Sequence, residues 1–236
     1  MSEDASDTGE PFIRRPRPLA TRIAAATVAA ALAIGTVAIA IAAAISLRKD
    51  HPEKPPANVA TLTIGGRTVS QLGEGSTAII MLHGASTHRD AFFPFMPQLA
   101  AAGFATYTLD YPSAHIPRAE VLAVKQYAFD HGATKFVLMG SSLGAGYALQ
   151  LADLQPNATI SISAVRDYPN PGLVMAIASK NDGQTAKVAA RAADGGAAGS
   201  RLLIVSGQTH GADIVHPHPD ILPKIVAFLR VSETTA

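Results

Sequence analysis

One short segment of the chain combines residue types that fit nucleophilic chemistry. Ser142 stands in the sequence Gly-Ser-Ser-Leu-Gly at 140–144, between an apolar run at 136–139 and a stretch at 145–154 with the apolar spacing of a helix. Glycines two positions before and two after a serine let a strand and a helix pass close together and leave that serine at the tip of a sharp turn. Ser141 is interpreted as a turn residue. Small-residue turns also join strands to helices for no catalytic reason, so the pattern alone leaves both interpretations open.

A serine hydroxyl is a weak nucleophile at neutral pH and needs two partners. A histidine must take its proton, and a carboxylate must orient the imidazole and stabilise its charge. Candidates for both follow apolar runs later in the chain: Asp182 comes after the run at 173–178, and His210 comes after the run at 201–206. These two residues are therefore the first candidates for the acid and the base that would activate Ser142.

Other residues of the right types remain as alternatives. Asp167 or Asp213 could supply the carboxylate, because the Asn-Asp-Gly sequence of the first candidate is also an ordinary turn signal. His216 and His218 are alternative bases, and their alternation in His-Pro-His-Pro also invites a metal interpretation. Two histidines without a nearby set of carboxylates or cysteines make a weak metal site, so no metal is predicted.

Strands and helices that would position these residues alternate along the chain from about residue 59. The predicted strands are 59–64, 68–72, 77–82, 104–109, 136–139, 159–163, 173–178 and 201–206. The predicted helices are 90–102, 120–130, 145–154, 185–193 and 221–229. This alternation predicts an α/β fold with a mostly parallel central sheet, helices on both faces and right-handed crossovers. Chemistry is expected just after the carboxyl ends of the strands.

The Ser142 segment and almost all of the sequence after residue 58 resemble the α/β-hydrolase family. The resemblance rests on the G-x-S-x-G turn between a strand and a helix, and on candidate partners that follow in the order acid, then base. It implies an α/β-hydrolase fold in which Ser142 is the nucleophile, Asp182 the orienting acid and His210 the base.

The same resemblance implies two backbone donors for the oxyanion that forms during attack. One is the amide of Leu143, which directly follows the nucleophile. The other comes from the loop after the third predicted strand, where His83-Gly84 is similar to the family's HG motif and Ala85 would turn its amide inward. Ser86 is the next candidate. His83 is interpreted as a structural residue that orients this loop.

The short connection between two late strands indicates an open cleft. Family members often insert a lid there, but only residues 164–172 are available, which is too few for a lid domain. The expected lining residues are Leu143, Phe92, Phe93, Tyr111 and Ile214. Hydrolysis of small-molecule carboxylic esters, without a cofactor, is the function expected. Thioesterase, peptidase and acyltransferase activity, or a non-catalytic binding module on the same scaffold, remain open.

Composition sets broad limits on the chain. Its 236 residues, with 48% hydrophobic and 16% charged residues, can form one ordinary domain with a short appendage. A formal net charge of +1 gives no electrostatic reason to expect a nucleic-acid partner. Cysteine is absent, which excludes disulfides and thiolate metal sites. Nothing in the composition indicates an oligomeric state.

The amino-terminal part has a different character. Residues 1–22 are polar and Pro/Arg-containing, which predicts a disordered cytoplasmic tail, whereas residues 23–47 contain no charge and no polar face. About 20 apolar residues suffice to span a bilayer, so 23–47 is predicted to be a transmembrane helix or signal anchor. Residues 48–57 are a charged, Pro-rich linker, and 58–236 form the hydrolase domain.

The flanking charges suggest an orientation for this segment. Slightly more basic residues precede it than follow it, which favours a cytoplasmic amino terminus and an extracytoplasmic catalytic domain on a single-pass membrane protein. A cleaved signal peptide, with its cleavage site at Ala42-Ala43-Ala44, is the alternative. The basic residues concerned are Arg14, Arg15, Arg17 and Arg22 before the segment, and Arg48, Lys49 and Lys54 after it.

Overall fold

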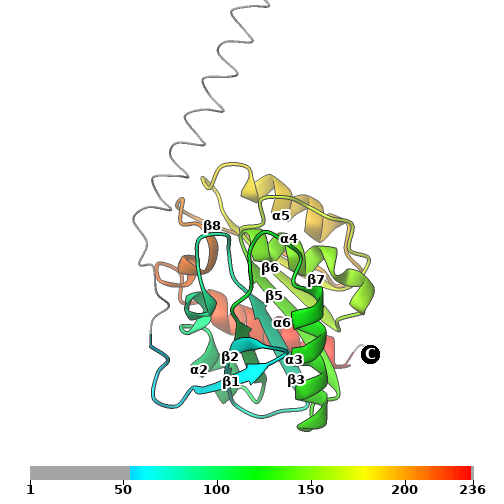
Figure 1. Cartoon of the computed structure of the whole chain (residues 1–236). Coiled ribbons are helices and arrows are strands. Elements are labelled where there is room, and N and C mark those ends of the chain that lie inside the picture. Colours follow the sequence, from blue (N-terminus) through cyan, green and yellow to red (C-terminus); the bar gives the residue numbers. More distant parts are fainter. Residues whose placement is uncertain (1–53, 235–236) are drawn as a thin grey trace, which may run out of the picture. The chain divides into compact units, whose positions relative to one another are not determined.

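The computed structural model describes residues 54–234, which form an α/β domain around one eight-stranded sheet (Figure 1). The strands are β1 Ala60–Ile64, β2 Arg67–Leu72, β3 Thr77–Leu82, β4 Ala105–Leu109, β5 Lys135–Ser141, β6 Ala158–Ile162, β7 Val174–Ser179 and β8 Arg201–Val205. The α-helices are α2 Met96–Ala101, α3 Arg118–Asp130, α4 Leu143–Gln150, α5 Thr185–Asp194 and α6 Ile221–Thr234. Short 3-10 helices are η1 Arg89–Phe92, η2 Ala152–Leu154 and η3 Gly211–Val215.

The sheet is mostly parallel, as predicted. Its strand order is β1-β2-β4-β3-β5-β6-β7-β8, and β2 runs antiparallel to both of its neighbours. Every neighbouring pair from β4 to β8 is parallel. The order reverses around β3, where β4 lies on one side and β5 on the other. Such reversal points open a crevice at the carboxyl ends of the strands, so β3 and β5 define where a ligand can enter.

Helices cover both faces of the sheet because side chains alternate along each strand. Ile79 and Met81 of β3 pack in one cluster with residues of α2 and α6. Ala78 and Ile80, one position out of phase, pack in another cluster with residues of α3 and α4. A third cluster joins α4 and α5 to β7. Strands buried on both faces explain why the runs read from the sequence are continuously apolar.

The first two strands, β1 and β2, form a hairpin. Ile64 pairs with Arg67, so only Gly65 and Gly66 form the loop, with φ values of 57° and 74°. Two consecutive positive φ values are typical of a type I′ turn, whose twist matches that of the flanking strands.

The predicted helix at 90–102 is wrong in its extent. The structure has two pieces there, η1 and α2, separated by Phe93, Pro94 and Phe95. Pro94 has no backbone N–H and cannot continue a hydrogen-bonded helix. Pro97 is tolerated because it occupies the first turn of α2. The sequence pattern also failed to predict η3, which directly follows His210.

The predictions for residues 1–22 and 23–47 lie outside the described residues. Between residues 54 and 234, the structure contains no helix that is both long and apolar enough to cross a membrane.

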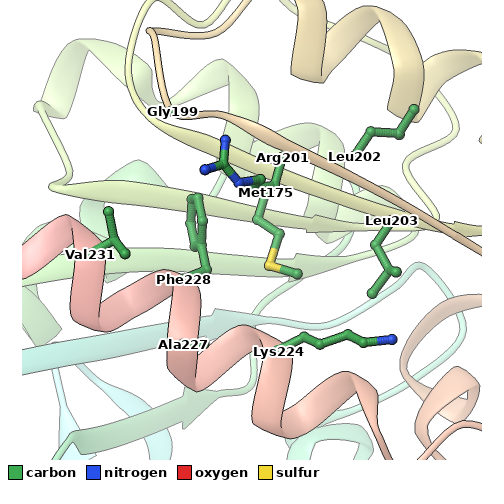
Figure 2. Close-up of a pocket in the computed structure, with 9 residues that line it drawn as sticks. All are labelled: Met175, Gly199, Arg201, Leu202, Leu203, Lys224, Ala227, Phe228 and Val231. Carbon is green, nitrogen blue, oxygen red and sulfur yellow. The ribbon is translucent and has the colours of Figure 1, made fainter.

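A groove of about 340 Å³ lies between β8 and α6 (Figure 2). Met175 and Arg201, at the beginnings of β7 and β8, line it together with Phe228 of α6. Strand beginnings lie at the edge of the parallel sheet opposite the carboxyl ends. This groove is therefore separate from the loops that carry Ser142, Asp182 and His210.

Candidate active site

Ser142 occupies a strained turn between β5 and α4. Its backbone angles are φ 55° and ψ −115°, in a region that residues with a side chain rarely adopt. Its N–H donates to the backbone oxygen of Ile162 at the end of β6 (2.8 Å), which holds the turn against the neighbouring strand. Strain of this kind costs about 1–3 kcal/mol and persists only where the surroundings enforce it.

Both glycines of the motif are required by close packing. A Cβ atom at Gly140 would lie 2.1 Å from the backbone oxygen of Gly144. A Cβ atom at Gly144 would lie 2.1 Å from the backbone oxygen of Leu82, the last residue of β3. The turn therefore brings α4 against the end of β3 at the crevice, which only glycine permits.

His210 lies between Ser142 and Asp182 and contacts both. Its Nε2 atom is 2.7 Å from Ser142 Oγ, and its Nδ1 atom is 2.7 Å from Asp182 Oδ2. Because a carboxylate can only accept, Nδ1 carries the proton and donates to it, which leaves Nε2 free to accept from the serine hydroxyl. The Asp182 side chain is 14% exposed and that of His210 43%, so the acid is sheltered while the base faces solvent.

Two of the alternative residues from the sequence, Asp167 and His218, contact other groups. Asp167 forms an ion pair with Arg191, with 2.5 Å between Oδ2 and Nε. The Nε2 atom of His218 lies 2.9 Å from the backbone oxygen of Ser206. The hydrogen-bonded chain that starts at Ser142 runs through His210 to Asp182.

Hydrogen bonds join the loop that carries Asp182 to the loop that carries His210. Ser179 Oγ donates to the backbone oxygen of Thr209 (2.7 Å), and the Asn181 N–H donates to that of Gly207 (2.9 Å). Thr185 Oγ1, at the start of α5, lies 3.0 Å from Asp182 Oδ2 and can donate to it. These contacts fix the carboxylate and the imidazole relative to each other.

Ser141 has a role that the sequence analysis missed. Its buried Oγ accepts a hydrogen bond from the Ala212 N–H at 2.9 Å, which ties the base loop to the end of β5. Gly211 adopts φ 67°, and a Cβ atom there would lie 2.8 Å from Ser141 Oγ. A glycine directly after His210 indicates that another part of the chain packs closely against this position. The sequence does not show that this part is Ser141.

The loop after β3 lies beside Ser142. A Cβ atom at Gly84 would be 3.3 Å from Ser142 Cβ, and Ala85 is the next residue. The Gly84 N–H donates to Thr87 Oγ1 (2.8 Å), which closes this loop into a tight turn. Leu143, the first residue of α4, follows the nucleophile directly. The two backbone amides predicted as oxyanion donors thus belong to segments that flank Ser142.

His83 is buried under this loop. Its Nδ1 donates to the backbone oxygen of Gly84 (2.7 Å), and its Nε2 accepts from the Tyr111 N–H (3.4 Å). The ring also stacks on Tyr111, with centroids 4.2 Å apart. Burial lowers the pKa of His83, because a desolvated imidazolium is unfavourable. These contacts agree with a structural role for His83.

A second chain of contacts connects α4, the helix that follows Ser142, to the same loop. Tyr147 Oη of α4 donates to the backbone oxygen of Ser113 (2.7 Å). Ser113 Oγ in turn donates to the backbone oxygen of Ala85 (3.2 Å). Helix α4 therefore positions the Ala85 loop as well as Ser142.

The predicted cleft lining is largely wrong. Phe92 and Ile214 are completely buried, and Phe93 is 8% exposed, all within the core between the sheet, α2 and α6. Tyr111 packs against His83 and is also buried. Leu143 is partly exposed. Aromatic residues near a strand end could not be assigned to core or cleft before the helix positions were known.

Comparisons with known proteins agree with this architecture. The model of the alpha/beta hydrolase family matches residues 79–215, more than half of the 236-residue chain. No curated protein sequence matches the chain.

Solved structures share the fold at low sequence identity. TT1662 from Thermus thermophilus is 15% identical, with a TM-score of 0.60 over 75% of this chain and 99% of its own. Est1E from Butyrivibrio proteoclasticus is 15% identical, with a TM-score of 0.59 over 76% of this chain and 100% of its own. The Pyrococcus furiosus esterase Pf2001 is 12% identical, with a TM-score of 0.56 over 73% and 91%. At these identities the similarity concerns the fold alone.

Proposed function

The chain belongs to the alpha/beta hydrolase family, and from this we propose that it is a serine hydrolase that cleaves carboxylic esters through a covalent acyl-enzyme. The observation that carries the proposal is the continuous hydrogen-bonded chain from Ser142 Oγ through His210 to Asp182. A hydroxyl, an imidazole and a carboxylate in this order are the groups that nucleophilic acyl transfer needs.

In the proposed reaction, Ser142 Oγ attacks the ester carbonyl while His210 Nε2 takes its proton. Asp182 stabilises the imidazolium that forms. The amides of Ala85 and Leu143 donate to the oxyanion of the tetrahedral intermediate. The intermediate collapses when His210 gives its proton to the departing alcohol, which leaves the acyl group on Ser142 Oγ.

Water completes the proposed cycle. His210 takes a proton from a water molecule that attacks the acyl carbonyl, and a second tetrahedral intermediate then releases the carboxylic acid and restores the serine hydroxyl. The exposure of the imidazole supports this step, because water can reach the base directly. All groups used are side chains and amides of this chain, so the proposed reaction requires no cofactor.

An activity probe tests the proposal directly. A fluorophosphonate should label the protein once, and peptide mass spectrometry should place the modification on Ser142. The Ser142→Ala variant should be neither labelled nor able to hydrolyse short aryl esters, while its far-UV circular dichroism matches that of the parent. Ser141→Ala is the control for the position of the label: the adduct should remain on Ser142, while loss of the Ser141–Ala212 hydrogen bond is expected to slow the reaction. Labelling of Ser142→Ala, or a probe adduct on another residue, would exclude this assignment.

A further inference from the structure

Two basic side chains at the carboxyl edge of the sheet have no partner in the described chain. Arg166 follows β6 and Lys180 follows β7, and both are exposed. Within residues 54–234 neither side chain forms an ion pair or a hydrogen bond with another residue. We call these two residues the basic corner.

The Arg166 backbone lies beside Gly146, which is one helical turn from Ser142. Its backbone oxygen is 3.8 Å from the position of a Cβ atom at Gly146 in α4. The Gly146 N–H in turn donates to the backbone oxygen of Ser142 (3.3 Å). The long side chain of Arg166 thus starts close enough to reach a group attached to a substrate bound at the nucleophile.

Lys180 directly follows β7, the next strand in the same direction. The Ser163 N–H donates to the backbone oxygen of Ile177 (2.8 Å), so the ends of β6 and β7 are level with each other. Neighbouring strands are about 4.8 Å apart, so β7 is about 10 Å from the strand that carries Ser142. Lys180 begins just past that end.

The carboxylates near the basic corner are already engaged. Asp167 pairs with Arg191, and Asp182 accepts a hydrogen bond from His210. Neither carboxylate forms an ion pair with Arg166 or Lys180, so both cations can contact a ligand. A substrate group that complements this charge must be anionic.

We infer that the basic corner makes the enzyme prefer esters that carry a carboxylate or phosphate several bonds from the scissile carbonyl. The inference rests on the proposed esterase function and narrows its substrate class. The anionic group would lie between the guanidinium and the ammonium while the carbonyl lies at Ser142. Because both cations are exposed, their contribution should weaken as salt concentration rises.

Matched ester pairs test this preference. One pair is 4-nitrophenyl hexanoate and the 4-nitrophenyl monoester of adipic acid, which differ in the charge at the end of the acyl chain. The other is phenyl acetate and 4-carboxyphenyl acetate, which differ in charge on the alcohol side. The measured quantity is kcat/KM for the anionic member divided by kcat/KM for the neutral member. In at least one pair, Arg166→Gln and Lys180→Gln should each lower this ratio about 2- to 5-fold, as expected for exposed charge pairs.

Two further variants sharpen the test. Arg166→Lys should keep most of the preference, because it retains the charge. Arg201→Gln should leave the ratio unchanged, because Arg201 is an exposed arginine at the opposite edge of the sheet whose guanidinium bonds to the backbone oxygen of Ser200. The inference is wrong if neither Arg166→Gln nor Lys180→Gln lowers the ratio in either pair. It is also wrong if Arg201→Gln lowers the ratio by the same amount.

A binding measurement separates the two proposals. Calorimetric titration with adipate and with the neutral hexanamide needs no catalysis. Weaker binding of adipate to Arg166→Gln than to the parent would support the basic corner even if no ester were hydrolysed. If the protein hydrolyses esters but neither prefers the anionic esters nor binds adipate more tightly than hexanamide, the esterase proposal is supported and the basic corner is rejected.

Discussion

Ser142 combines backbone strain with the side chain on which the proposed chemistry depends. Of the three proposed triad residues it is the one with a positive φ. Its conformation is held by the Ile162 hydrogen bond and by the close approach of Gly144 to β3. The strained conformation places the hydroxyl within hydrogen-bond distance of His210 Nε2. Folding stability is therefore lower at the position where the proposed reaction needs a fixed geometry.

This strain predicts that, at position 142, the glycine variant is more stable than the alanine variant, which is the reverse of the usual order. Glycine normally destabilises a protein by about 0.5–1 kcal/mol relative to alanine. At position 142 relief of about 1–3 kcal/mol of strain should outweigh that entropic cost. Ser142→Gly should therefore have a free energy of unfolding about 1 kcal/mol higher than Ser142→Ala, as measured by urea denaturation. The opposite order would show that the turn is not strained.

The buried His83 predicts a pH dependence of stability. Burial lowers its pKa in the folded protein below the ordinary value of 6.5, so below pH 6.5 the unfolded chain binds a proton that the folded protein resists. Its stabilising contribution is present above pH 6.5 and is lost as the pH falls toward the folded pKa. The slope should approach about 1.4 kcal/mol per pH unit.

Urea unfolding between pH 7.5 and 5 measures this slope. His83→Gln should unfold at lower urea overall, because it loses the stacking on Tyr111, but its free energy of unfolding should fall less steeply with decreasing pH. Equal slopes for the parent and His83→Gln would contradict the prediction.

At the scale of single residues, the sequence indicated which side chains form the candidate site. It did not indicate the hydrogen bonds that hold those side chains in place. Ser142, Asp182 and His210 could be selected because each follows a recognisable strand, and they lie within hydrogen-bond distance in the structure. Their catalytic roles remain predictions. The contact of Ser141 with Ala212 could not be predicted, since it joins two loops whose separation depends on the whole sheet.

At the scale of elements, the packing of α4 against β3 depends on a single glycine. A Cβ atom at Gly144 would lie 2.1 Å from the Leu82 oxygen and 2.4 Å from the His83 oxygen, both backbone atoms that cannot move independently. At Gly146, two residues later in the same helix, the nearest atom is Tyr168 Cε2 at 3.5 Å. The two positions form a matched pair.

Alanine at the two positions should have opposite effects. Gly146→Ala should raise the free energy of unfolding by about 0.5–1 kcal/mol, because alanine favours helix and the space is free. Gly144→Ala should lower it by about 1–3 kcal/mol through overpacking, and should also reduce ester hydrolysis by moving the nucleophile. Thermal unfolding and kcat/KM for a short aryl ester measure both effects. Equal tolerance at the two positions would contradict the close approach.

Most helices and strands could be predicted, because the spacing of the apolar residues and the turn-forming residues between segments indicated the same boundaries. The β3 run matches its predicted bounds, and the other strands differ by few residues. The exception is the helix predicted at 90–102, where the aromatic spacing concealed the break at Pro94. The second failure, the cleft lining, arose because Phe92 and Ile214 belong to the buried cluster that also contains residues of α2 and α6, and the sequence does not show which residues near a strand end are buried in this way.

At the scale of the whole molecule, the described residues 54–234 contain the eight-stranded sheet and the proposed triad. We therefore expect a chain of residues 54–236 to unfold cooperatively and to hydrolyse short esters with kcat/KM close to that of the full chain. The segment 23–47, which contains no charged residue, is proposed to anchor the full chain in a membrane.

Fractionation of cells that produce each chain tests this division. The full chain should stay with the membrane fraction after a carbonate wash, whereas residues 54–236 should be released. A fluorophosphonate that cannot cross membranes should label the full chain on intact cells if the catalytic domain is extracytoplasmic. Release of the full chain by carbonate would exclude an integral anchor, and loss of folding in residues 54–236 would show that the domain needs the preceding segment.

The exposure of His210 has a consequence for the fate of the acyl group. The connection between β6 and β7 contains no helix, and the imidazole is 43% exposed, so the acylated serine would face bulk solution. Any small alcohol or amine dissolved there would then compete with water without first occupying a site. The ratio of methyl ester to carboxylic acid formed should rise linearly with methanol concentration and show no saturation, and selectivity among acceptors should follow their intrinsic reactivity.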